Sequence, residues 1–169
     1  MTMLDVKSRW EQLRETMPAM QLYALVDGVQ YQTQLCKRLQ RGNGLFPLFV
    51  GTPDAALAHA GPWLVDVSLV DESLITELAT LERDTPSLTW LIAPQDLEGL
   101  GQMLQLRLDV CLPDGRTALL RFWDPRVLVK LARTLDGPQR EYFFSHIHEW
   151  HLLHEGQRVW IGRQHADAH

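Results

Sequence analysis

The side chains best suited to chemistry gather near the end of the chain, where several histidines lie close together. They are His146, His148, His151 and His154, and His165 and His169 follow them. Imidazole nitrogens are common zinc ligands, so this group is a candidate metal site. On the helix that we predict for residues 139–154, however, each step of three residues turns the side chain by about 60°, which strains a site with three ligands. Since neither a cysteine pair nor a His-Glu-x-x-His motif supplies another ligand, we predict no native metal site and no cofactor.

A catalytic site needs a nucleophile or an acid–base group with supporting neighbours. The candidates are Ser145 beside His146, and Asp124 with Arg126. The sequence contains no Gly-x-Ser-x-Gly elbow, no Walker phosphate loop and no complete dinucleotide glycine motif. Asp124 also has a structural explanation, because it precedes Pro125 as a helix N-cap does. We therefore predict that the chain is not an enzyme. The alternative is a small metal-dependent hydrolase that uses Asp124, Arg126 and a histidine from residues 146–154.

Arginine and tryptophan, which are enriched in the hot spots of protein–protein interfaces, meet in one segment. Trp123 lies between Arg121 and Asp124 at the end of a predicted hairpin. Residues 107–140 hold seven basic and four acidic side chains, whereas residues 50–106 hold one basic and nine acidic. This separation indicates either two solvated faces that partly attract each other or a bipolar surface for a protein partner. The candidate partner-binding residues are Arg107, Arg121, Trp123, Asp124, Arg126, Lys130 and Arg133.

The composition is typical of a globular protein, since 46% of the 169 residues are hydrophobic and 22% are charged. The formal net charge of −5 argues against a general nucleic-acid binder. Asp5, Lys7 and Arg9 interrupt the start of the chain where a secretory signal needs an apolar run, and no stretch reaches the roughly 18 apolar residues that cross a bilayer. We predict a cytoplasmic protein without nucleic-acid or membrane partners, with Cys36 and Cys111 reduced in its core.

Apolar periodicity and turn residues predict strands that alternate with helices, followed by a hairpin and two helices. Strands are expected at residues 22–26, 45–50, 63–67 and 88–93, and helices at 6–17, 32–39, around Leu57, at 71–81 and at 96–107. Asp114-Gly115 between two apolar runs predicts a hairpin over residues 108–122. Asp124-Pro125 opens a helix that extends to Leu135, and a last helix is expected over 139–154.

These elements predict a mixed α/β fold with a small mixed sheet, flanking helices, the hairpin near residues 108–122 and a C-terminal helical lobe. We expect one domain over residues 1–162. It divides into an α/β lobe (1–122), a helical lobe (123–156) and a short strand that returns to the sheet (157–162). A polar tail follows at residues 163–169.

Short motifs along most of the chain point to a known family. In order they are Tyr23-Ala-Leu-Val-Asp-Gly28, Leu48-Phe-Val-Gly-Thr-Pro53, Gly61-Pro-Trp-Leu64, Trp90-Leu-Ile-Ala93, Leu112-Pro-Asp-Gly115 and Leu119-Leu-Arg-Phe-Trp-Asp-Pro-Arg-Val-Leu128. Their order and spacing over residues 22–150 resemble the bacterial type VI secretion effector chaperones, adaptor proteins long described as a domain of unknown function. Other residues of these motifs either bind the partner or hold the fold. They are Asp27, Gly61, Pro62, Asp114, Gly115, Pro125 and Trp150.

The resemblance implies a non-enzymatic, cytoplasmic adaptor. Such a protein binds a cognate toxic effector, through an N-terminal or linker segment of that effector, and promotes its loading onto the VgrG-type spike protein of the secretion apparatus. The resemblance also implies that the helix after Pro125 influences the choice of partner. A structural subunit of the secretion baseplate is a further alternative, which would assemble stably with components of the apparatus.

Overall fold

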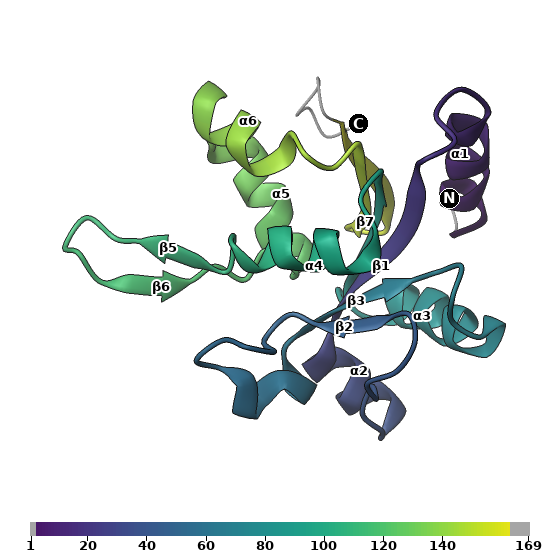
Figure 1. Cartoon of the computed structure of the whole chain (residues 1–169), viewed down its shortest axis with the longest axis horizontal. Coiled ribbons are helices and arrows are strands. Elements are labelled where there is room, and N and C mark those ends of the chain that lie inside the picture. The colour runs from purple at the N-terminus through teal and green to yellow at the C-terminus, as the bar shows by residue number, and fades with distance from the viewer. Residues whose placement is uncertain (1–2, 163–169) are drawn as a thin grey trace.

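The computed structural model describes residues 3–162, which form a six-stranded sheet, helices that pack against it and a separate hairpin (Figure 1). The strands of the large sheet are β1 (Gln21–Asp27), β2 (Leu45–Pro47), β3 (Pro62–Asp66), β4 (Leu88–Ala93), β7 (Glu149–His154) and β8 (Gln157–Gly162). The helices are α1 (Met3–Thr16), α2 (Gly28–Leu35), α3 (Glu72–Asp84), α4 (Leu97–Gln105), α5 (Pro125–Thr134) and α6 (Gly137–Phe144), with a 3₁₀ helix, η1 (Ala55–Ala60). The hairpin pairs β5 (Asp109–Cys111) with β6 (Thr117–Leu119). The predicted mixed α/β class is confirmed.

The large sheet has the strand order β2-β3-β1-β4-β7-β8, and each neighbouring pair is antiparallel. The expected mixture of parallel and antiparallel pairs is therefore wrong. Helix α3 does connect two strands that run in the same direction, β3 and β4, as a helical crossover usually does. Strand β1 lies between them and is antiparallel to both, so the alternation of strands and helices along the chain does not produce a parallel pair.

Two apolar cores lie on the two faces of this sheet, because successive residues of a strand point to opposite sides. Leu22, Ala24 and Val26 of β1 belong to the core under α1, α2 and α3. Tyr23 and Leu25 of the same strand belong to the core under α4, α5 and α6. The two helical layers are thus positioned by one strand that is buried on both faces.

The predicted helix over residues 139–154 is wrong in its second half. Helix α6 ends at Phe144, and residues Glu149–His154 form β7, which pairs with β4 on one side and β8 on the other. Glu155 and Gly156 both have positive φ angles, of 52° and 74°, which suits the two-residue turn of a hairpin. The predicted helical lobe therefore reduces to α5 and α6, whereas the predicted returning strand at 157–162 is confirmed as β8.

The remaining predictions are partly confirmed and partly wrong. The hairpin, the strand at 88–93 and the helix that begins at Pro125 are confirmed, and Pro47 lies on an edge strand as expected. Cys36 and Cys111 are exposed rather than buried, because the first caps α2 in a left-handed conformation and the second lies on the hairpin. None of the helices within residues 3–162 is long and apolar enough to span a bilayer.

Two buried carboxylates connect helices to the edge of the sheet that carries β7 and β8. Glu82 of α3 accepts hydrogen bonds of 2.6 and 2.9 Å from the Arg158 guanidinium of β8. Glu149 of β7 accepts hydrogen bonds from Arg9 of α1 and pairs with His151. Burial alone would raise the pKa of Glu149, but the hydrogen bonds from His151 and Arg9 outweigh burial and lower this pKa. These long-range pairs fix α1 and α3 relative to the sheet.

The start of α2 lies in close contact with residues 59–61, which lead into β3, and this contact predicts how a substitution changes stability. A Cβ atom on Gly28 would lie 2.5 Å from the carbonyl oxygens of both His59 and Gly61, and backbone atoms cannot move aside easily. We expect Gly28→Ala to lower the free energy of unfolding by about 2 kcal/mol or more, measured by chemical denaturation. Gly137→Ala is the control, since nothing lies within 4 Å of the added Cβ at this other helix start. It should leave stability unchanged or raise it by up to about 1 kcal/mol, and equal losses in both variants would contradict the packing argument.

Candidate functional site

Charged motif residues from distant parts of the chain meet at one end of the large sheet. Asp27 is the last residue of β1, and Asp124 is the N-cap of α5. The charges of Arg121 and Asp124 act on the pKa of Asp27, and those of Arg121 and Arg126 act on the pKa of Asp124, which places the four residues in one electrostatic cluster. We call these four residues and Trp123 the motif cluster. The fold thus unites residues nearly a hundred positions apart that the sequence analysis selected separately.

Asp124 and Arg126 form the best-defined pair of this cluster. The Asp124 carboxylate accepts hydrogen bonds from the Arg126 backbone N–H at 2.9 Å and from its Nε and Nη2 at 3.0 and 2.8 Å. Burial by itself would raise the pKa of Asp124, but the side-chain and backbone hydrogen bonds from Arg126 outweigh it and lower this pKa. The carboxylate is therefore held ionised, as an N-cap that also orients an arginine.

The pKa of Asp27 is shifted in the opposite direction from that of Asp124. Its side chain accepts a hydrogen bond from the backbone N–H of Val29 at 3.0 Å and so caps α2. Burial raises the pKa of Asp27, and the negative charge of Asp124 acts in the same direction, while the hydrogen bonds and Arg121 only partly compensate. The two carboxylates of the motif cluster are thus separated in acidity by their surroundings.

The cluster lies against closely packed backbone and aromatic rings. Gly28 donates its N–H to the Gly61 carbonyl at 2.9 Å, and a Cβ atom on Gly61 would lie 2.5 Å from the Phe49 ring. Phe49 packs edge-on against Trp123, with 5.8 Å between ring centroids. Trp123 is only 3% exposed, so its ring belongs to the core, and the Arg121 guanidinium lies 5.9 Å from the ring centroid. The absence of a side chain at Gly61 therefore leaves room for the Phe49 ring, and its absence at Gly28 lets the start of α2 approach the backbone of residues 59–61.

Arg107 lies inside the structure, in the turn between α4 and the hairpin. Its side chain donates hydrogen bonds to the carbonyls of Met103 at 2.8 Å, Tyr142 at 3.1 Å and Phe143 at 3.2 Å. These carbonyls belong to the last turns of α4 and α6, where cations are favoured. Burial lowers the pKa of Arg107, and no carboxylate of the described residues pairs with it. Its buried guanidinium therefore serves to join two helix ends.

The structure separates the remaining predicted site residues. Asp114 and Gly115 form the hairpin tip, and Trp150 is fully buried against Phe143 and Phe144. Pro125 is buried in the first turn of α5, and Pro62 starts β3 opposite Asp27. Four of the predicted partner-binding residues are exposed, namely Arg121, Arg126, Lys130 and Arg133. Of the others, Arg107 and Trp123 are buried and Asp124 is half-buried.

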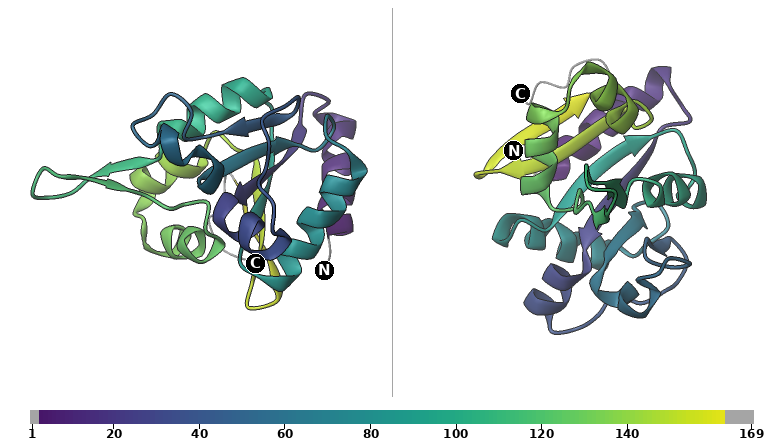
Figure 2. Two further views of the ribbon diagram at one scale, coloured as in Figure 1. Left: turned by 90° about the horizontal axis from the view of Figure 1, so that it is seen from below. Right: turned by 90° about the vertical axis from the view of Figure 1, so that its left-hand side faces the viewer.

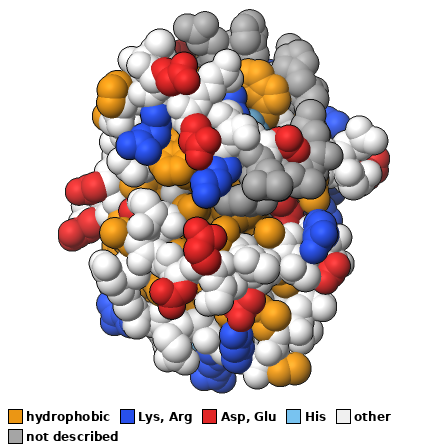
Figure 3. All heavy atoms as spheres, turned by 90° about the vertical axis from the view of Figure 1, so that its right-hand side faces the viewer, with side chains coloured by type: hydrophobic (Ala, Val, Ile, Leu, Met, Phe, Trp, Pro, Cys, Tyr) orange, Lys and Arg blue, Asp and Glu red, His pale blue; other side chains and the backbone are white. Residues whose placement is uncertain are grey.

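Helix α5 presents its basic residues on one face. Arg126, Lys130 and Arg133 follow one another at intervals of four and three, so they lie on the same side of the helix, away from the buried Leu128 and Ala132. We call these three residues the α5 basic face. By contrast, Figure 3 shows acidic and basic side chains interspersed on the side of the molecule where α1 and α3 lie. Within the described part of the chain, Lys130 and Arg133 have no ion-pair partner.

The histidines that the structure describes near the C-terminus do not form a group of three metal ligands. His151 hydrogen-bonds Glu149 and stacks on Trp160, and it lies on a strand instead of the predicted helix. Across residues 3–162, no group of three histidine, cysteine, aspartate or glutamate side chains lies close enough to hold a metal ion. His154 lines a cavity of about 370 Å³ together with Arg126, so this cavity brings a histidine near a residue of the hydrolase alternative. The Arg126 guanidinium is already bound to Asp124 there.

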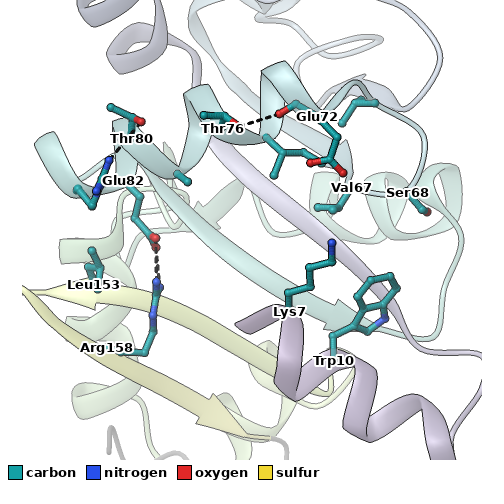
Figure 4. A pocket seen from close by; sticks show the side chains of 14 residues that line it. Lys7, Trp10, Val67, Ser68, Glu72, Thr76, Thr80, Glu82, Leu153 and Arg158 are labelled. Carbon is teal, nitrogen blue, oxygen red and sulfur yellow. Dashed lines mark hydrogen bonds and ion pairs between the residues drawn. The ribbon is translucent and has the colours of Figure 1, made fainter. Parts of the chain in front are cut away.

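A second cavity, of about 610 Å³, lies between α1, α3 and the end of the β7–β8 hairpin (Figure 4). Trp10 and Lys7 of α1 line one side, and the Glu82–Arg158 pair lies on the other. None of the site residues predicted from the sequence borders this cavity. Sequence reasoning also missed the roles of Gly28 and Phe49, because Asp27-Gly28 has the composition of a turn and nothing local marks Phe49 as a neighbour of Trp123.

The fold and the cluster define a class of protein: a mixed α/β protein with an antiparallel six-stranded sheet, a projecting hairpin and a charged motif cluster at the start of α5. The chain belongs to the family described as domain of unknown function DUF4123, whose model matches residues 22–142. The match includes all of the motif cluster and the hairpin. No curated protein and no solved structure matches the chain.

The Arg107 contacts predict a large loss of stability on substitution. Arg107→Met removes all the donors to three helix-terminal carbonyls, so we expect the free energy of unfolding to fall by roughly 3 kcal/mol. Hydrogen exchange of the α6 amides should accelerate as well. Arg116→Met is the matched control, because Arg116 pairs only with Asp114 at the exposed hairpin tip and should contribute less than about 1 kcal/mol. Similar losses in the two variants would refute the assigned role of Arg107.

Because the pKa of Asp27 is raised and that of Asp124 is lowered, the two carboxylates should change the stability of the fold in opposite directions as pH falls. The folded-state pKa of Asp124 is lowered, so the stability that its charge contributes is present above the unfolded pKa of about 3.9 and is lost as pH falls through the folded pKa. The advantage of the native chain over Asp124→Asn should therefore shrink on acidification. The folded-state pKa of Asp27 is raised, so the native chain should gain stability relative to Asp27→Asn as pH falls. Denaturation curves between pH 3 and 7 measure both, and slopes of equal sign would contradict the assignment.

Proposed function

We propose that the protein is an adaptor that binds a cognate type VI secretion effector in the cytoplasm and promotes its loading onto the VgrG-type spike protein. Membership of the DUF4123 family supports this proposal through the resemblance of the family motifs to effector chaperones. The observation that carries the binding role is the α5 basic face, which shares Arg126 with the motif cluster and includes two cations, Lys130 and Arg133, that have no ion-pair partner among the described residues.

The surface has the character of a protein-binding site more than of a catalytic one. The charged groups of the motif cluster already have interactions within the chain: Asp124 binds Arg126, Asp27 caps α2, and the Arg121 guanidinium lies over the Trp123 ring. Lys130 and Arg133 extend the positive charge along α5 for two further turns. A row of exposed cations on a rigid helix favours association with an acidic segment and rejects a basic one. The partner segment that we propose is therefore acidic.

The experiment that tests the proposal is co-expression of the untagged chain with the tagged product of the neighbouring gene. A complex of defined stoichiometry, with improved solubility of the neighbour, is the expected result. If the chain purifies alone and the same preparation contains bound metal and hydrolyses a panel of ester and phosphoester substrates, the hydrolase alternative replaces the adaptor. Stable stoichiometric assembly with components of the secretion apparatus would instead favour a baseplate subunit.

Charge reversal on the α5 basic face should abolish this co-purification. In Lys130→Glu/Arg133→Glu, both side chains are exposed, so the free energy of unfolding should change by no more than about 1 kcal/mol while binding weakens at least tenfold. The reversal avoids Arg121 and Arg126 because these two arginines take part in the motif cluster.

The matched control is Arg38→Glu/Arg41→Glu, which makes the same charge change at exposed positions between α2 and β2. This variant should retain binding, measured by pull-down and titration calorimetry. Equal weakening by both double variants would indicate a response to net charge alone and would remove α5 from the proposed interface.

A further inference from the structure

The β5–β6 hairpin forms a sheet of its own that is not hydrogen-bonded to the large sheet. It extends away from the body in Figure 1 and in the left view of Figure 2, and β5 and β6 pair only with each other. Each strand has three residues, and most of their side chains are exposed. A two-stranded hairpin on its own is marginally stable in water, whereas a third strand adds both hydrogen bonds and packing. The free edges of the hairpin are therefore available to pair with a strand of a binding partner.

The hydrogen-bond register identifies which backbone groups are free. Leu120 donates its N–H to Leu108 at 2.6 Å, and Leu112 donates to Arg116 at 2.7 Å, which makes Val110 and Ala118 a hydrogen-bonded pair as well. In an antiparallel pair the intervening residues direct their N–H and C=O groups outward. These are Asp109 and Cys111 on the edge of β5, and Thr117 and Leu119 on the edge of β6. No other described strand pairs with either edge.

The two edges differ in charge. Strand β5 begins at Asp109, and an exposed acidic side chain on an edge strand discourages further pairing. Strand β6 carries no charge on its three residues, and Arg116 and Arg121 stand on either side of it. Leu119, the large apolar residue of this strand, is 41% exposed. The β6 edge therefore lacks the features that protect β5.

Exposed apolar surface also gathers at the base of the hairpin. Leu106 is 75% exposed and Tyr142 is 65% exposed. Both are neighbours of Arg107, since Leu106 precedes it in the chain and the Arg107 guanidinium lies 5.6 Å from the centroid of the Tyr142 ring. Cations follow β6 along the chain at Arg121 and on the α5 basic face.

We propose that the free edge of β6 binds an extended segment of the partner protein, which adds a third strand to the hairpin. The outward N–H and C=O groups of Thr117 and Leu119 pair with the backbone of that segment, as in other cases of strand addition. Its side chains alternate between the two faces of the hairpin, one carrying Ala118 and Val110 and the other carrying Leu119 and Thr117. An apolar residue therefore fits opposite Ala118 and opposite Leu119, and acidic residues fit beyond them near Arg116 and Arg121. The inference rests on the proposed function, and it specifies the partner segment as extended and acidic.

Proline substitution tests this proposal, because proline removes one backbone N–H. Thr117 and Cys111 face each other in the register, and both direct their N–H groups outward, so neither substitution breaks a backbone hydrogen bond within the hairpin. Thr117→Pro should weaken the complex with the tagged product of the neighbouring gene about tenfold or more, through the lost hydrogen bond and the obstructing ring. Cys111→Pro should leave the dissociation constant unchanged. Circular dichroism and thermal melts establish that both variants are folded.

Amide hydrogen exchange gives a direct readout of the edge. In the free chain the amides of Thr117 and Leu119 should exchange rapidly, and in the complex they should become protected, while those of Asp109 and Cys111 stay unprotected. Protection of the β5 amides instead, or of neither edge, would overturn the proposed strand addition.

The outcomes separate this inference from the proposed function. If the native chain forms no complex with its neighbour, the proposed function fails and the inference fails with it. If the native chain binds and Thr117→Pro binds equally well, or both proline variants weaken binding equally, only the β6 edge is excluded. If light scattering shows a dimer of the native chain that Thr117→Pro dissociates, a second copy of this chain occupies the edge and the proposal of a partner strand is wrong.

Discussion

The buried guanidinium of Arg107 is the interaction on which the second helical layer depends. Its three hydrogen bonds join the last turns of α4 and α6, whose terminal carbonyls would otherwise lack donors. The same residue stands one position before Leu108, which is buried where the hairpin leaves the body. A single cation thus fixes the angle between two helices and the point at which the hairpin begins. Its charge is balanced by helix-end carbonyls and by aromatic rings, without a carboxylate.

A continuous series of aromatic contacts connects this point to the motif cluster. Phe143 contacts Phe122, Phe122 contacts Trp123, and Trp123 contacts Phe49. Movement at either end is opposed by close packing, because Gly61 leaves no room between Phe49 and the backbone. The motif Arg121-Phe-Trp-Asp-Pro-Arg126 therefore has two parts: its aromatic and proline residues build the core, and its charged residues occupy the end of the sheet. Residues that look alike as interface candidates in the sequence have different positions in the fold.

This division explains how a rigid body can present a binding surface. Both faces of the large sheet are covered, so the exposed features at the end of α5 and along β6 are held by a scaffold with two cores. The hairpin extends the exposed surface away from the body, and the α5 basic face gives this surface positive charge. In the function that we propose, the scaffold provides the geometry, and the partner supplies the strand and the acidic side chains that these surfaces lack. Long-range pairs such as Glu82 with Arg158 keep the opposite face in place.

Features that depend on neighbouring residues can be predicted from the amino-acid sequence. The apolar run at 88–93, the Asp114-Gly115 turn and the Asp124-Pro125 start of α5 are local signals, and they predicted the α/β class, the hairpin and most of the motif cluster. Residues 149–154 form a strand because pairing with β4 and β8, which are distant in the chain or outside the local pattern, outweighs their helical pattern. The tertiary structure also buries Arg107 and Trp123 while it leaves Lys130 and Arg133 exposed. Burial depends on which segments pack over a residue, and those segments lie far away along the chain.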